Sequence, residues 1–201
     1  MKHLAPLVAL LVFVFLSACS PGAGGVFGGG TRTARTVDVT QLPSMRVVGF
    51  IVVVPETLSV SEANSYKPSA DIVWREDPLG DRHDQVKAIF EDSITRAVAS
   101  FTGDLPVVLH IEVRRFHAVT ERTRYTIGGV HEIDFVLSVT NGTTGDVIIP
   151  PYFISSKFRA FGGEEALAAE HAGLTQKVRI TAHLEELIVQ ELTGKPAAPE
   201  L

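Results

Sequence analysis

The stretch LPVVLHIEVRRFHAV, residues 105–119, carries a period of two that decides the fold. Its odd positions are apolar as far as residue 113. Side chains along a strand alternate between the two faces of a sheet, so this pattern predicts a long strand with one buried and one wet face. The pattern breaks at Arg115 and His117, where the strand is expected to leave the core. The polar face before that break carries His110, Glu112 and Arg114.

Further strands are expected on both sides of this one. Residues 45–54 (MRVVGFIVVV) are apolar on both faces, which predicts a central strand covered on both sides. A short strand is expected at 71–75. Residues 133–139 alternate again and lead through an Asn-Gly turn into 147–161. Prolines 150 and 151 confine that last strand to an edge or a break.

Two amphipathic helices complete the domain. Apolar residues recur at three and four spacing over 81–101, and Gly103 is expected to end that helix. A second helix is expected over 164–192, with Gly173 as a weak point in its middle. The predicted fold is therefore α+β. It is a two-layer sandwich with a mostly antiparallel sheet of about four or five strands and two helices packed on one face.

The N-terminus has the pattern of a secretory signal. Lys2 and His3 precede an apolar run from residue 4 to 16, too short to span a membrane. The run closes on Leu16-Ser17-Ala18-Cys19, which resembles the lipobox of bacterial lipoproteins. The resemblance implies cleavage before Cys19 and lipidation of Cys19, so that membrane lipid is the first expected partner. Ser20 after the cysteine favours the outer membrane, facing the periplasm, over the inner one.

These observations divide the chain into four expected parts. Residues 1–18 are a signal peptide, and residues 19–36 are the lipidated cysteine with a Gly-rich tether. Residues 37–194 form a single α+β domain, and 195–201 form a disordered tail. The chain has 201 residues and a formal net charge of −5, and this mild acidity argues against a nucleic-acid partner.

The order of elements resembles a known group of envelope proteins. A lipobox, a Gly-rich tether, the RVVGFIVVV and VVLHIEVRRFHAV strands, a meander and a C-terminal helix are similar to ABC-type transport auxiliary lipoproteins. The segment ADIVWREDPLGDRHDQVKAIFEDSI is similar to uncharacterised alphaproteobacterial lipoproteins. The resemblance implies an envelope location and a role beside a transport system. It brings no catalytic residues.

The sequence offers no assembled catalytic or metal motif. His110 and Glu112 share a strand face, but any polar face of a half-exposed sheet has this pattern. The chain contains no Gly-x-Ser-x-Gly, and its single cysteine is taken by the lipid. We therefore expect no enzyme activity, no metal and no cofactor.

One basic cluster is a candidate partner-binding surface. It surrounds the connection between two predicted strands, and arginine and aromatic side chains of this kind anchor interfaces. The alternative is a solvated, mobile hairpin end. In both cases changing Arg122 and Arg124 to Glu is expected to leave folding intact, because substitutions at an exposed loop tip usually shift stability little. The candidate residues are Arg114, Arg115, Arg122, Arg124 and Tyr125.

Three roles are compatible with this sequence. The first is a lipid-anchored, non-catalytic accessory or docking component of a transport or envelope-assembly system. The second is a periplasm-facing lipoprotein that holds a small apolar molecule between sheet and helices. A core filled by Phe50, Trp74, Phe90 and Phe135 would exclude this second role. The third is an envelope hydrolase, which would need a third polar partner beside His110 and Glu112.

Overall fold

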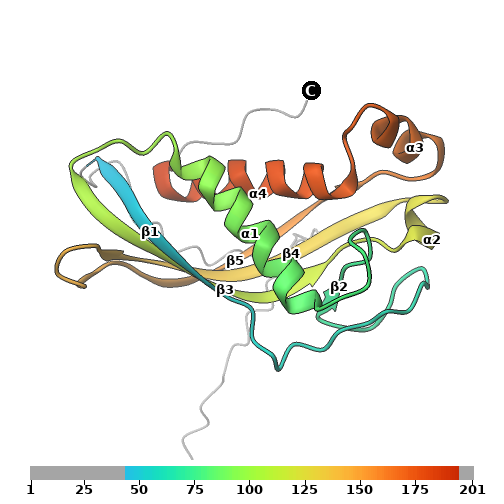
Figure 1. The fold of residues 1–201 in the computed structure, drawn as a ribbon, viewed down its shortest axis with the longest axis horizontal. Coiled ribbons are helices and arrows are strands. Elements are labelled where there is room, and N and C mark those ends of the chain that lie inside the picture. The colour runs from blue at the N-terminus through green and yellow to red at the C-terminus, as the bar shows by residue number, and fades with distance from the viewer. Residues whose placement is uncertain (1–43, 195–201) are drawn as a thin grey trace, which may run out of the picture. The chain divides into compact units, whose positions relative to one another are not determined.

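The computed structural model describes residues 44–194. Its backbone is an open, mostly antiparallel sheet with helices on one face, as predicted (Figure 1). The lipobox residues Leu16, Ser17, Ala18 and Cys19 and the tail from residue 195 lie outside the described residues. No helix between residues 44 and 194 is long and apolar enough to cross a membrane.

Strand β3 (Leu105–His117) organises the sheet. Val107, Leu109 and Val113 are fully buried, which confirms the predicted alternation. On one side β3 pairs in parallel with β1 (Met45–Val53) along residues 105–112, and then with the short β2 (Ile72–Val73) at residues 116 and 117. Two strands from earlier in the chain thus share one edge of β3. The predicted departure from the core at His117 is wrong, because β2 covers this end and His117 is buried.

The other side of β3 carries the meander. β4 (Gly129–Asn141) pairs antiparallel with β3, and β5 (Val147–Ala160) pairs antiparallel with β4. β5 is an edge strand, as its two prolines predicted. One side of an edge strand has no partner strand, so the backbone N–H groups that proline lacks are not needed there. The register with β4 shifts between Leu137 and Thr140, where Ile149 and Tyr152 flank Pro150-Pro151.

The prediction that residues 45–54 form a doubly covered central strand is wrong. β1 lies at the edge of the sheet, and three of its side chains are about half exposed. The reason is that helices cover one face only, so the apolar outer face of β1 has no covering layer in the described chain. The exposed side chains are Val48 (49%), Ile51 (50%) and Val53 (47%).

Helix α1 (Arg82–Val98) begins where the sequence predicted. The Asp81 carboxylate accepts hydrogen bonds from the backbone N–H groups of His83 and Asp84, a standard N-cap. The helix ends earlier than Gly103. Gly103 instead allows two backbone segments to approach closely, because a Cβ there would lie 2.2 Å from the backbone of Ser44.

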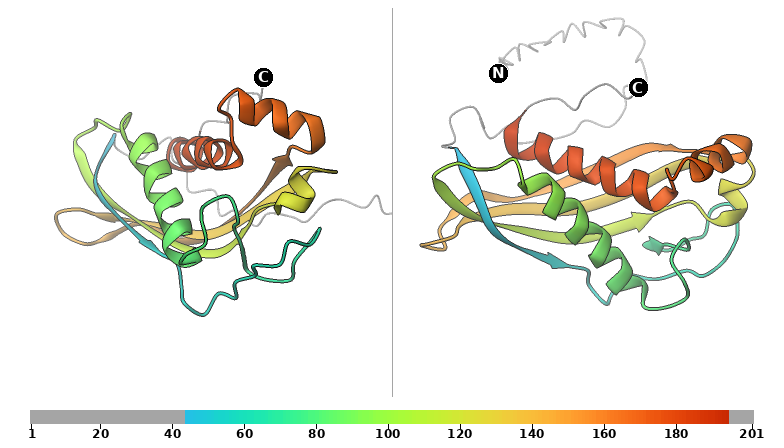
Figure 2. Two further views of the ribbon diagram at one scale, coloured as in Figure 1. Left: turned by 45° about the vertical axis from the view of Figure 1, so that its right-hand side comes forward. Right: turned by 45° about the horizontal axis from the view of Figure 1, so that its top comes forward.

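The predicted C-terminal helix is two helices. α3 (Gly163–His171) and α4 (Gln176–Thr193) are separated at Gly173, whose φ of 78° ends α3. The Thr175 hydroxyl then caps α4 by accepting from the backbone N–H of Val178. The weak point at Gly173 is therefore a complete break, and it gives α3 a direction of its own (Figure 2).

The core lies between the sheet and helices α1 and α4. The rings of Trp74 and Phe116 meet edge to face at 5.7 Å, and those of Phe90 and Phe135 at 5.5 Å. All four side chains are fully buried, and Phe50 packs against the same cluster. This is the filled core that the sequence argument named as incompatible with a small apolar ligand held between sheet and helices.

Candidate functional site

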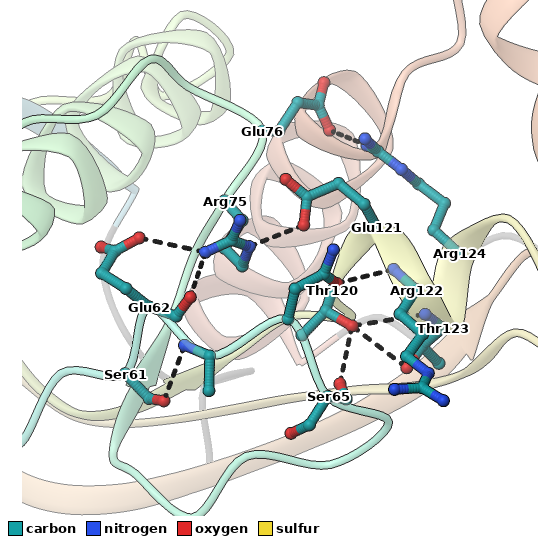
Figure 3. Close-up of polar contacts among 12 residues, drawn as sticks. Ser61, Glu62, Ser65, Arg75, Glu76, Thr120, Glu121, Arg122, Thr123 and Arg124 are labelled. Atoms are coloured by element: carbon teal, nitrogen blue, oxygen red, sulfur yellow. Dashed lines mark hydrogen bonds and ion pairs between the residues drawn. The ribbon is translucent and has the colours of Figure 1, made fainter.

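The connection between β3 and β4 is a short helix, α2 (Glu121–Arg124). Its N-cap Thr120 accepts from the backbone N–H of Thr123 and donates to the carbonyl oxygen of Ser65 at 2.8 Å. The Thr123 hydroxyl donates to the carbonyl oxygen of Tyr66, also at 2.8 Å. The polar loop before β2 is thereby fastened across α2 (Figure 3).

Charged side chains strengthen this attachment. Arg75 donates from Nε to Glu121 at 2.6 Å and also contacts Glu62. Arg82, at the start of α1, donates from Nε to Glu62 at 2.6 Å. That hydrogen bond and the positive charges of Arg82 and Arg75 hold the pKa of Glu62 below its ordinary value, against a smaller opposing effect of burial. We call the region formed by α2 and the loop 61–66 the α2 corner.

Arg124 is the buried centre of this corner. Nη1 donates to Glu76 at 3.0 Å, and Nη2 donates to the hydroxyl of Tyr125 at 3.2 Å. Nε lies 3.3 Å from Oε1 of Glu170 on α3, close enough for an ion pair but not aligned for a hydrogen bond. Glu76 also accepts from the backbone N–H of Lys177 at the start of α4. Arg124 therefore joins α2 to α3 directly, and it is linked to α4 through Glu76.

The basic residues singled out from the sequence do not form one continuous surface. Arg114 is half exposed on the outer sheet face and pairs with Glu112 at 3.1 Å. Arg115 lies 3.3 Å from Glu132. The exposed Arg122 stacks over the Tyr66 ring at 4.5 Å. Of these basic-cluster residues, Arg122 and the half-exposed Tyr125 are the two that the α2 corner presents to solvent.

A hollow opens beside the corner. It has a volume of about 360 Å³. Ile127 is 75% exposed, and Val130 and Tyr66 are each 48% exposed. The sequence analysis does not predict this apolar rim. The signal for it is Ile127, an apolar residue within the otherwise polar stretch TERTRYTIGG. The hollow is lined by Tyr66, Lys67, His117, Ala118, Val119, Thr123, Ile127, Gly128, Gly129, Val130 and Glu132.

The remaining polar candidates make structural contacts. The His110 ring nitrogen Nε2 is 2.9 Å from the Thr140 hydroxyl on the neighbouring strand. Between residues 44 and 194, no three His, Cys, Asp or Glu side chains gather in a way that could hold a metal. A pair unseen in the sequence joins β5 to α4, where the Ser156 hydroxyl lies 2.7 Å from Nε2 of His183. Phe158 stacks on that His183 ring at 3.8 Å.

His131 on β4 is a buried neutral histidine. It is 1% exposed, and neither ring nitrogen has a hydrogen-bond partner in the described part of the chain. Burial lowers its pKa to about 3, and the positive surroundings, Arg179 foremost, act in the same direction. The alternation of β4 could have placed this side chain on the core face from sequence alone.

Acid is expected to destabilise the fold through His131. In the unfolded chain this histidine regains its ordinary pKa of 6.5, so between pH 6.5 and about 3 the unfolded state binds a proton that the folded state does not. Stability should fall by about 1.4 kcal/mol per pH unit within that window, and it should be insensitive to His131 above it. Urea unfolding at several pH values should show a shallower acid slope for His131→Phe. His171→Phe, on the exposed face of α3, is the control, and equal slopes for H131F and the unmodified chain would contradict the expectation.

The described residues define a small α+β protein with an open sheet and, at one end, the α2 corner held by hydrogen bonds and ion pairs. A family model matches residues 45–200, and the chain belongs to that family, a family of unknown function (DUF6778). No curated protein matches the chain.

Solved structures similar to this chain include bacterial proteins at low identity. A candidate lipoprotein from Caulobacter crescentus CB15 is 15% identical and has a TM-score of 0.33 over 54% of this chain and 80% of its own. Protein XCC0632 from Xanthomonas campestris, of the DUF330 family, is 12% identical with a TM-score of 0.46 over 76% and 85%. Hypothetical protein CT253 from Chlamydia trachomatis is 12% identical with a TM-score of 0.38 over 74% and 95%. None of these structures assigns a role to a residue of this chain.

Proposed function

We propose that this protein is a lipid-anchored, non-catalytic envelope lipoprotein that docks onto a transport or envelope-assembly system through the α2 corner. The lipobox-like Leu16-Ser17-Ala18-Cys19 and the Gly-rich stretch support the anchor, and Ser20 supports an outer-membrane, periplasm-facing location. The resemblance to ABC-type transport auxiliary lipoproteins supports the transport role.

The observation that carries the docking role is the hollow at the α2 corner. Exposed apolar side chains around a concavity are typical of interaction sites, and here Ile127, Val130 and Tyr66 surround one. The supporting backbone is fastened by hydrogen bonds from Thr120 and Thr123, so that the surface is ordered before binding. Preorganisation of this kind reduces the entropy lost on association.

The charges at the rim indicate the chemistry of the partner. Arg122 and Lys67 are exposed beside the apolar side chains, and Lys67 is only loosely paired, 4.0 Å from Glu132. An apolar side chain flanked by acidic residues, on an extended segment of an envelope protein, would complement this surface. We take that segment as the occupant of the hollow.

Loss of the cysteine should detach the protein from membranes. Cys19→Ala removes the thiol that would be acylated, and a flexible tether alone has no affinity for lipid. We expect the variant to move from the membrane pellet to the soluble periplasmic fraction, as measured by fractionation and immunoblotting. A Ser20→Ala variant, next to the same cleavage site, should remain in the pellet. Cleaved Cys19→Ala that still sediments with membranes would refute the anchor.

Substitution of Ile127 should abolish partner capture without unfolding the domain. Ile127→Asp introduces a charge into the apolar rim and repels an acidic segment, so we expect at least a tenfold loss of crosslinked partner. Surface changes of this kind usually shift stability by less than about 0.5 kcal/mol. In vivo crosslinking followed by mass spectrometry measures the capture.

The matched control is Leu79→Asp. Leu79 is 83% exposed in the turn before α1, away from the hollow. The control should retain the partner fully. If I127D and L79D recover the same envelope proteins in the same amounts, docking at the α2 corner is wrong.

A further inference from the structure

A second, smaller cavity lies on the helix side of the sheet, between α2, β4, α3 and α4. Its lining includes the side chains of Arg124, Arg179, His131 and Gln176. It leaves about 10 Å³ for the centre of a water-sized sphere, which is room for about one water molecule. This cavity shares Val119 with the open hollow at the α2 corner, but its other lining residues differ, and the proposed docking role does not depend on it.

Unmet hydrogen-bonding capacity is concentrated in this cavity. Both ring nitrogens of His131 and the Gln176 side-chain oxygen are buried without partners in the described chain. So are Nε of Arg124 and Oε1 of Glu170, which approach each other without aligning. Buried polar atoms are normally satisfied by protein or by an ordered molecule. Several such atoms around one cavity indicate a site built for a polar occupant.

The charge of the lining indicates an anion. Arg124 and Arg179 contribute two guanidinium groups. Arg179 stacks on Phe161, with the guanidinium carbon 3.2 Å from the ring centroid, and it donates to the carbonyl oxygen of Arg159. Guanidinium groups bind carboxylate and phosphate oxygens through paired N–H donors. His131 adds one donor in its neutral form.

Helix α3 closes this cavity and is weakly held. Ala166 is its one buried residue. Glycines with positive φ lie at its first residue, Gly163 at 57°, and just beyond its end, Gly173 at 78°. The polar contacts that tie α3 down involve carboxylates: Glu165 to Arg159 at 2.6 and 2.5 Å, and Glu170 to Arg124 and to the hydroxyl of Tyr125. A competing anion can replace a carboxylate in contacts of this type.

We infer that the cavity is the closed form of a binding site for an oxyanion, the carboxylate or phosphate group of a small molecule or an acidic amphiphile. The Glu170 carboxylate occupies the position beside Arg124 that the ligand's anionic group takes on binding. α3 swings on Gly163 and Gly173 to admit the ligand. The side chains of Val119, Phe161 and Leu174 give the opened site an apolar wall.

The inference is tested on residues 19–201 carrying Cys19→Ala. Dodecyl phosphate below its micellar concentration, inorganic phosphate and the neutral dodecyl maltoside are titrated by calorimetry. Glu170→Gln removes the internal competitor while keeping its shape, and it should tighten binding of a phosphate probe at least fivefold. His131→Phe fills the cavity and should weaken binding at least tenfold. Amide exchange in residues 163–171 should increase when the probe binds.

The outcomes separate the sources of the anion. Binding of dodecyl phosphate that responds to both variants identifies an acidic amphiphile as the ligand. Binding of inorganic phosphate with the same response identifies a free anion. Equal binding of dodecyl maltoside, or phosphate affinities that neither E170Q nor H131F changes, would overturn the inference. Both variants must first give the cooperative unfolding transition of the unmodified chain.

Discussion

Replacing Arg124 by Ala is expected to cost about 3–5 kcal/mol of unfolding free energy, a large part of the stability of a domain of this size. The Arg124 side chain is 10% exposed, and its partners Glu76 and Glu170 are 16% and 26% exposed. Removing the guanidinium leaves two poorly solvated carboxylates without their counter-charge. Urea unfolding followed by circular dichroism measures the change.

Two further substitutions serve as comparison variants for this prediction. Arg124→Lys keeps the charge but loses the planar fork that reaches Glu76 and Glu170 together, so its cost should be intermediate. Arg122→Ala lies two residues away on the same short helix, with its side chain exposed over Tyr66. It should change stability by less than about 1 kcal/mol. Equal losses for R124A and R122A would show that the buried contacts do not stabilise the α2 corner.

Gly162→Ala is expected to be the second severely destabilising change, by about 3 kcal/mol. A Cβ on Gly162 would lie 2.1 Å from the backbone nitrogen of Gly128 and 2.5 Å from the carbonyl carbon of Ile127. These are backbone atoms, so neither of the two chain segments can move away from the added methyl group without a large energetic cost. The contact places the start of α3 against the turn that follows α2, so the variant should weaken the approach of Glu170 to Arg124.

Gly49→Ala provides the matched control. Gly49 lies in β1, and an added Cβ there meets no atom within 4 Å. Its substitution should be neutral or slightly stabilising, since alanine loses less backbone entropy than glycine on folding. Thermal unfolding of the two variants side by side distinguishes a steric effect from a general sensitivity to glycine replacement. Similar melting temperatures for G162A and G49A would refute the steric argument.

Local patterns predicted most of the sheet and failed where a contact was distant in sequence. The alternation around Leu109 and the two prolines of β5 act within their own strands, so periodicity identified them. The apolar run of β1 has the same letters whether its outer face is covered by a helix or left open. Only the position of the helices decides between the two, and no local signal carries that information.

The candidate site shows the same division. The sequence predicts Arg122, Arg124 and Tyr125 as members of one exposed cluster because they surround the same strand connection, but Arg124 is buried. Its burial depends on Glu76 and on Glu170, which come from distant parts of the chain. Sequence spacing cannot place those carboxylates around one guanidinium. The break at Gly173 was visible as a weak point, and the N-cap at Thr175 makes it complete.

The pairing of β1 with β3 also constrains when this protein can fold. β1 precedes all other strands in the chain, yet it pairs with residues 105–112. Likewise, Glu76 accepts a hydrogen bond from Lys177, which lies 101 residues further along the chain. A high proportion of such distant contacts slows folding, because the intervening loop must close before any contact stabilises it. The valines of β1 therefore stay unpaired until residues 105–112 are available to them. A holding chaperone that recognises apolar strands would find its target in the first segment of the domain.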